Sequence, residues 1–243
     1  MLKEEFKKMY ELEDNHWWFV AKRHFISQVV PKGRNLKILD IGAGTGGTTK
    51  FLKRYGKVVG LEPNQLARNL ARKKGFKLLT GSAEKLPFEA KSFDLACLFD
   101  VLYHKGVKND LKALKETYRV LKPNGYLMIT DSALELLRGP HDVALHGRKR
   151  YSKKELSSKV KKVGFIVEKV SYIFFFIFPV TLVKRLLSKL AAKSNPRYCE
   201  SDVKKLPYFL NGLLIKICTL EARLLNLIDF PWGSSVIIRA RKP

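Results

Sequence analysis

The feature that most constrains the fold is a glycine-rich loop that begins at residue 42. The loop reads Gly42-Ala43-Gly44-Thr45-Gly46-Gly47, follows an apolar run at 36–41 and precedes a helix-like segment at 47–55. Glycines at this spacing, between a strand and a helix, are typical of parallel sheets that bind a nucleotide, because they let the backbone approach the ligand closely. The loop therefore predicts a nucleoside cofactor at the end of the first strand.

The rest of the chain alternates short apolar runs with amphipathic segments, which is the pattern of repeated βα units. Strands are expected at 36–41, 57–61, 76–80, 93–98, 125–130, 165–172 and 235–240, and helices at 47–55, 65–74 and 109–121. Ser152 and Glu155 have the spacing of a capping box, so a further helix is expected to begin there. The fold class expected is α/β, a Rossmann-like seven-stranded and mostly parallel sheet with helices on both faces.

The domain boundaries follow from where this alternation stops. We expect an N-terminal helical cap at 1–34, a core at 35–172 plus 234–243, and a hydrophobic helical insertion at 173–233 within the same domain. An ordinary hairpin loop has two to five residues, so an insertion of about 60 is expected to be functional.

The insertion has two apolar parts. The first is the run 173–183, which is followed by Lys184 and Arg185 and is too short to span a membrane. The second places one leucine-rich stripe at helical spacing: Leu210, Leu213, Ile217, Leu220, Leu224 and Leu227. These helices could form a lid over the sheet or lie in a bilayer interface with their basic residues against anionic headgroups.

The charge and the cysteine and histidine content limit the kinds of partner and metal site that the chain can have. The net charge of +25 suggests an anionic partner: a membrane surface, a nucleic acid or a phosphorylated substrate. Three cysteines are too few and too scattered for a disulfide framework or a zinc site. His141 and His146 lack a third ligand for zinc, so no metal site is expected. The N-terminus lacks the apolar run of a signal peptide, so we expect a cytoplasmic protein, with attachment to a membrane surface as an open possibility.

Two acidic residues indicate which cofactor binds. Glu62 lies at the end of the second strand, where a carboxylate can accept hydrogen bonds from both ribose hydroxyls. Asp40 lies two residues before the first glycine, where it would repel a pyrophosphate but attract a cation. S-adenosylmethionine, which carries an ammonium and a sulfonium, therefore fits better than a nicotinamide dinucleotide.

Five segments together carry a family resemblance: 38–46 (ILDIGAGTG), 60–64 (GLEPN), 81–88 (GSAEKLPF), 92–94 (SFD) and 119–125 (RVLKPNG). In order and spacing they resemble the class I S-adenosylmethionine-dependent methyltransferases, and most closely the subgroup with the ubiquinone and menaquinone biosynthesis enzymes. The resemblance covers about residues 36–131. It implies the strand order 3-2-1-4-5-7-6, with strand 7 antiparallel.

The resemblance also implies a role for each matching residue. It places Asp40, Gly42, Ala43 and Gly44 around the methionine part of the cofactor, Glu62 on the ribose, Pro63, Ser82 and Ala83 beside the adenine, and Asp100 and Val101 at the methyl-transfer pocket. Ser82 stands where the family usually has an aspartate, so this contact differs from the usual one.

The acceptor is less constrained. The segment after the fourth strand lacks the Asn/Asp-Pro-Pro-Tyr signature of enzymes that methylate nucleobase amino groups, and His104 there is a candidate general base. His146, Arg148, Arg150 and Tyr151 form a basic cluster that could hold a phosphate or carboxylate, or could be a solvated loop.

We therefore expect a methyltransferase acting on a hydrophobic or lipid-linked acceptor at the membrane surface. The alternatives are an RNA methyltransferase, which the charge would suit, and a regulatory module that binds S-adenosylmethionine without turnover.

Overall fold

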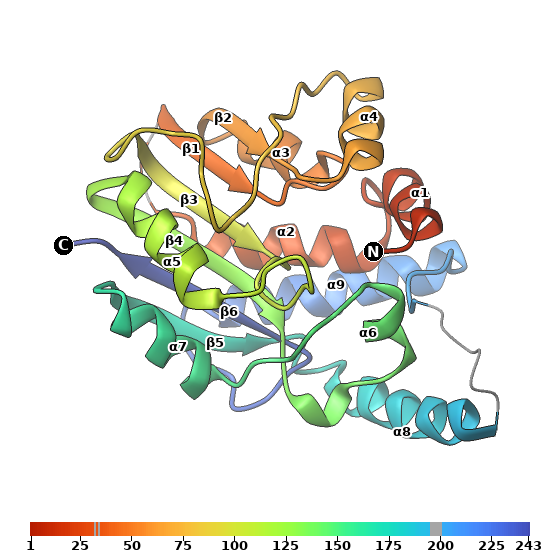
Figure 1. The fold of residues 1–243 in the computed structure, drawn as a ribbon. Coiled ribbons are helices and arrows are strands. Elements are labelled where there is room, and N and C mark those ends of the chain that lie inside the picture. Colours follow the sequence, from red (N-terminus) through yellow and green to blue (C-terminus); the bar gives the residue numbers. More distant parts are fainter. Residues whose placement is uncertain (32, 34, 195–200) are drawn as a thin grey trace.

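The structure is a computed structural model that describes residues 1–31, 33, 35–194 and 201–243, with no side chains described over 190–200. Its centre is a six-stranded sheet in the order β2-β1-β3-β4-β6-β5 (Figure 1). The strands are β1 (Leu36–Ile41), β2 (Gly56–Leu61), β3 (Phe93–Phe99), β4 (Leu121–Ser132), β5 (Ile166–Ile173) and β6 (Ser235–Arg241). β2, β1, β3 and β4 run parallel, whereas β6 is antiparallel to both β4 and β5. The α/β fold class and the antiparallel last strand are thus confirmed.

Helices cover both faces of the sheet. Figure 1 shows α5 and α7 on one face and α2 and α9 on the other. The helices are α1 (Lys3–Leu12), α2 (Trp17–Val29), α3 (Gly47–Leu52), α4 (Gln65–Lys73), α5 (Asp110–Val120), α6 (Pro140–Ala144), α7 (Lys153–Lys162), α8 (Phe178–Ser194) and α9 (Tyr208–Leu224). Ser152 caps α7 as expected, since its hydroxyl accepts the Glu155 backbone N–H at 3.1 Å.

The central strands are apolar on both faces because helices cover each side. In β3 every residue except Asp94 is buried, and its neighbours β1 and β4 contribute a similar run. The buried run explains why the sequence pattern identifies these strands so well.

The expected strand at 76–80 is wrong. Only Leu79 pairs with the sheet: its N–H donates to the Gly60 carbonyl at 2.9 Å, and its carbonyl accepts the Glu62 N–H at 2.9 Å. Leu78 is the only buried side chain in that range, and Leu79 is 41% exposed. Too little apolar surface is buried at this edge to continue a strand, so the sheet has six strands rather than seven.

The two insertion helices differ in how they pack. α9 lies along α2, and its buried face consists of Cys218, Glu221 and Ala222. The Glu221 carboxylate accepts the backbone N–H groups of Phe175 and Phe176 at 2.8 and 3.1 Å, which ties α9 to the end of β5. Within the described residues, no helix is both long and apolar enough to cross a bilayer.

Candidate functional site

A cavity of about 860 Å³ runs along the carboxyl ends of the parallel strands. Nine of the ten residues predicted to hold the cofactor line it: Gly42, Ala43, Gly44, Glu62, Pro63, Ser82, Ala83, Asp100 and Val101. The N-terminal helices α1 and α2 form another wall, and side chains from the 173–233 insertion form a third. The fold thus brings the glycine loop, the cap and the insertion around one space.

The loop and Glu62 support each other. Gly42 and Gly44 have φ of +74° and +56°, a region that favours glycine. The Gly44 N–H donates to Glu62 Oε2 and the Asn64 N–H donates to Glu62 Oε1, each at 2.9 Å. Burial raises the pKa of Glu62, and these two N–H groups oppose that shift. Because a carboxylate has about four lone-pair sites, Glu62 keeps acceptor capacity for two ribose hydroxyls.

Glu13 occupies the start of α3, where a dinucleotide-binding fold would hold its pyrophosphate. Its Oε2 accepts the Gly47 N–H at 3.1 Å and the Thr45 hydroxyl at 2.8 Å, and its Oε1 pairs with Lys74 at 2.7 Å. A Cβ on Gly47 would lie 2.4 Å from Glu13 Oε2, so glycine is needed there. With a carboxylate already in this place, a cofactor phosphate would be repelled.

Asp40 lies beneath the cavity rather than on its lining. The side chain is 2% exposed, and its Oδ2 accepts the Thr49 hydroxyl at 2.6 Å. Burial raises its pKa to about 6. Asp40 is therefore expected to act on a bound cation through the low-dielectric interior and not through direct contact.

Lys22 on α2 lies at the middle of the cavity. It forms an ion pair with Asp100, which has a φ of +57° at the end of β3, and lies 4.6 Å from the Trp18 ring centroid. Burial lowers the pKa of Lys22 to about 7, and the carboxylates of Asp131 and Asp40 oppose that shift. The ion pair fixes Asp100 beside the predicted methyl-transfer pocket.

Sequence reasoning gave no role to Glu13 or to Lys22. Both lie in the N-terminal cap, outside the motifs of the resemblance, and both act on residues more than 30 positions away. In the sequence, their position beside the aromatic segment 16–19 is the feature that could have drawn attention to them.

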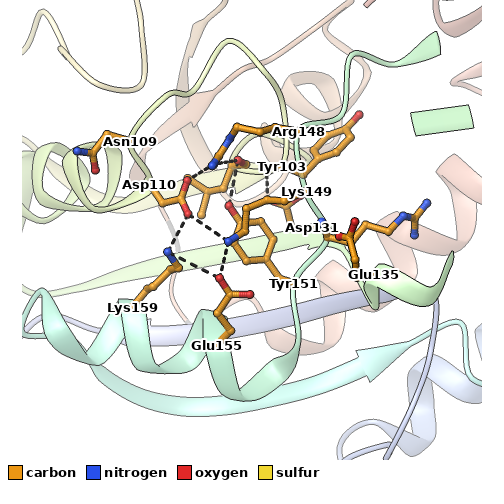
Figure 2. Close-up of polar contacts among 12 residues, drawn as sticks. Tyr103, Asn109, Asp110, Asp131, Glu135, Arg148, Lys149, Tyr151, Glu155 and Lys159 are labelled. Carbon is orange, nitrogen blue, oxygen red and sulfur yellow. Dashed lines mark hydrogen bonds and ion pairs between the residues drawn. The ribbon is translucent and has the colours of Figure 1, made fainter. Parts of the chain in front are cut away.

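The predicted anion cluster is divided by the fold. Figure 2 shows Arg148 and Lys149 turned toward Asp110, with Lys149 and Lys159 also reaching Glu155. Burial disfavours the ionised Asp110, but Lys159 and Arg148 outweigh it and hold its pKa below the usual value.

Three of the four predicted anion ligands do not line the cavity. Tyr151 is fully buried and its hydroxyl donates to the Leu102 carbonyl at 3.0 Å. Arg148 and His146 also lie off the lining. Only Arg150 lines the cavity, and its guanidinium is paired with Asp142, with Nε to Oδ1 at 2.8 Å. The charges of the cluster stabilise the loop, which is why its sequence misleads about a ligand.

His104 lines the cavity as expected of a candidate base. Its Nδ1 accepts the Gly106 N–H at 3.0 Å, and its Nε2 lies 3.1 Å from the Met1 amino nitrogen. Burial lowers its pKa to about 4, so the ring is neutral at pH 7. Across the described residues, no three histidine, cysteine, aspartate or glutamate side chains are arranged to hold a metal ion.

These residues fit S-adenosylmethionine. The loop offers a close backbone approach, Glu62 offers ribose acceptors, Ser82 offers a hydroxyl to the base, and the surrounding carboxylates favour a cation. When bound, this cofactor supplies an electrophilic methyl group.

Comparison with known proteins agrees with this geometry. Residues 39–129 match a family model described as a methyltransferase domain. The chain is 39% identical over 127 residues to a demethylmenaquinone methyltransferase from Chlorobaculum tepidum, covering 49% of each chain. It is 32% identical over 120 residues to a sarcosine/dimethylglycine N-methyltransferase from Aphanothece halophytica, covering 44% of this chain and 43% of that one.

A solved structure shares the fold over nearly the whole chain. It is a SAM-dependent methyltransferase, possible histamine N-methyltransferase, from Thermotoga maritima, with a TM-score of 0.62 and 22% identity over 99% of this chain and 96% of that one. The match to the two curated relatives spans about half of their own length. Residues 39–129 thus match a methyltransferase domain, and the whole chain shares its fold with a SAM-dependent methyltransferase.

Proposed function

We propose that the protein transfers a methyl group from S-adenosylmethionine to a small-molecule acceptor with a large apolar part. The observation that carries the proposal is that one cavity joins the cofactor residues to an apolar wall from the insertion. That wall consists of Ile177, Val180, Leu206, Leu210 and Leu214. A volume of about 860 Å³ is at the upper end of the range for ligand sites, which leaves room for an acceptor beside the cofactor.

Methyl transfer asks little covalent chemistry of the protein. The chain has to align the acceptor, exclude water and take a proton where the acceptor atom carries one. Lys22 and His104 are the lining groups suited to that proton, with pKa values of about 7 and about 4. Lys22 can take a proton only as the neutral amine, which its lowered pKa makes accessible near pH 7, whereas the ion pair with Asp100 holds the protonated form.

A quinone-type acceptor is the finer version of this proposal. The sequence motifs resemble the ubiquinone and menaquinone subgroup, and one relative is named a demethylmenaquinone methyltransferase. The other relative acts on sarcosine and dimethylglycine by its name. The apolar wall favours the former type of acceptor.

The test is transfer of radiolabelled methyl groups into total cell extract, followed by partition between organic and aqueous phases. We expect label in the organic phase, and much less with Glu62→Gln, which keeps the shape of the side chain but removes its charge. Label in RNA, together with a gel shift on tRNA that weakens steeply with salt, would favour the RNA methyltransferase. No transfer to any fraction, with S-adenosylmethionine still bound, would favour the regulatory module.

We also propose that α8 and α9 attach the protein to an anionic lipid surface. The predicted leucine stripe of α9 is divided: Leu213 and Leu220 are 42% and 55% exposed, whereas Leu210 lines the cavity. On α8, Val183 and Leu187 are 56% and 62% exposed. Lys184 on α8 is 56% exposed, and the described side chains of α8 include no acidic one, which matches anionic headgroups.

Sedimentation with vesicles tests the attachment. We expect binding to phosphatidylglycerol vesicles at low salt, release at high salt, and weaker binding for the pair Val183→Ser and Leu187→Ser. Leu136→Ser is the matched control, because Leu136 is 56% exposed but lies outside both helices. If the protein stays in the supernatant at low salt, the insertion is a lid and does not attach the protein to a membrane.

A further inference from the structure

The cavity has a second polar end, far from the glycine loop. Glu62 follows β2 at one edge of the sheet, whereas α8 follows β5 at the other edge. Figure 1 shows β2 and α8 on opposite sides of the molecule. Arg185 on α8 lines the same cavity as Glu62. A ligand that extends from the methyl-transfer pocket along the apolar wall would therefore meet Arg185.

Arg185 is buried without a full set of partners. Its side chain is 5% exposed, and its guanidinium forms an ion pair with Asp202. Among the described residues, its Nε has no hydrogen-bond partner. An unsatisfied buried donor is costly, and a charged one more so, which indicates a position completed by a ligand.

The charges near Arg185 leave a positive surplus. Arg150 is neutralised by Asp142, and its remaining nitrogen donates to the Ala133 carbonyl at 3.1 Å. Asp202 is shared by Arg185 and by Lys184, which pairs with it at 2.8 Å. Three cations thus face two carboxylates at this end of the cavity.

His141 adds a second donor. Its Nδ1 accepts the Asp202 N–H at 3.0 Å, and burial, with Arg185 nearby, lowers its pKa to about 4. The neutral ring therefore carries its proton on Nε2, and His141 lines the cavity. Arg185 and His141 can together donate to one oxyanion.

We propose that Arg185 and His141 bind the anionic group, a carboxylate or a phosphate, of an amphipathic methyl acceptor whose apolar body lies along α8 and α9. This inference rests on the proposed methyl transfer, because it names the class of molecule that enters the same cavity. It assigns substrate selection to the insertion and not to the 146–151 loop.

The experiment compares three probes with one apolar chain: dodecanoate, dodecyl phosphate and dodecanol, each below its micelle concentration. Quenching of tryptophan fluorescence reports binding, since Trp17 and Trp18 line the cavity. We expect at least one anion to bind tenfold or more tightly than dodecanol, and the preferred anion distinguishes a carboxylate site from a phosphate site.

Variants distinguish binding at Arg185 from a general effect of the protein's positive charge. Arg185→Gln should abolish the preference for the anion while leaving dodecanol binding unchanged. Lys189→Gln, on the same helix but off the cavity lining, should keep most of the preference. Arg185→Lys, which retains the charge but lacks the guanidinium Nε, should lose at least half of the preference for the anion. It also provides the test if Arg185→Gln fails to fold.

Equal binding of all three probes, or an unchanged preference in both Arg185 variants, would overturn the proposal. The assay requires no turnover. A preference for anions without methyl transfer would therefore contradict the proposed function alone, and transfer without the preference would contradict this inference alone.

Discussion

Glu62 is the residue on which cofactor affinity depends most. Replacing it with alanine removes a charged acceptor for the ribose, so S-adenosylmethionine binding should weaken by about 1 to 3 kcal/mol, or roughly 5- to 150-fold. Calorimetric titration measures the change. Glu89→Ala is the control, because Glu89 is exposed and does not line the cavity. If the wild type and Glu62→Ala bind S-adenosylmethionine with equal affinity, Glu62 does not contact the cofactor.

Asp40 should make cofactor affinity depend on pH. Its pKa is raised to about 6, so the carboxyl group is protonated below that pH and ionised above it. A cationic ligand is attracted by the ionised form, so affinity should rise as the pH increases through 6, and loss of the Lys22 proton near pH 7 acts in the same direction.

Titrations from pH 5 to 8 measure this dependence, and Asp40→Asn should bind more weakly at pH 7.5 and show a flatter profile. A wild-type affinity that rises as the pH falls would contradict the role given to Asp40.

At the scale of elements, Glu13 joins the N-terminal cap to the glycine loop. Glu13→Ala removes the acceptor of the Gly47 N–H and one of the partners of Lys74, so unfolding free energy should fall by about 1 to 3 kcal/mol in urea titrations. Glu11→Ala, on the exposed side of the same helix, should change it little.

A double-mutant cycle sharpens the test. Gly47→Ala should destabilise the wild type, because the new Cβ would clash with Glu13. In the Glu13→Ala background the same change should be neutral or stabilising, since alanine favours a helix. Additive effects would show that Glu13 does not occupy the start of α3.

The elements that sequence predicts well are those with a strong local pattern. The composition of β3 predicts a buried strand, and the spacing of the glycines after β1 predicts the loop. The segment at 76–80 has a similar composition, but its exposure at the sheet edge depends on what packs against it, which no local pattern records.

The candidate site shows the same limit. Motif residues such as Gly44 and Glu62 lie where the resemblance implies, because each follows a strand whose position is fixed by the sheet. Arg148 was expected at the ligand but pairs with Asp110, and Arg185 was not expected but lines the cavity. Charged side chains pair with residues distant in sequence, so only the folded chain shows which of them lies in the cavity.

At the scale of the whole molecule, the cap, the core and the insertion each supply one wall of the cavity. The core supplies the glycine loop, the cap supplies Lys22 and Glu13, and the insertion supplies the apolar wall and Arg185. This arrangement places the glycine loop and Glu62 on the sheet, and we expect the segments around it to select the acceptor.

The central claim is that this cavity binds S-adenosylmethionine and not a dinucleotide. Calorimetric titration of the intact protein with S-adenosylmethionine and, separately, with NADH tests it most directly. We expect saturable one-to-one binding of S-adenosylmethionine. We expect no measurable heat of binding for NADH, because the Glu13 carboxylate already occupies the start of α3. Tight binding of NADH, or no binding of S-adenosylmethionine, would contradict it.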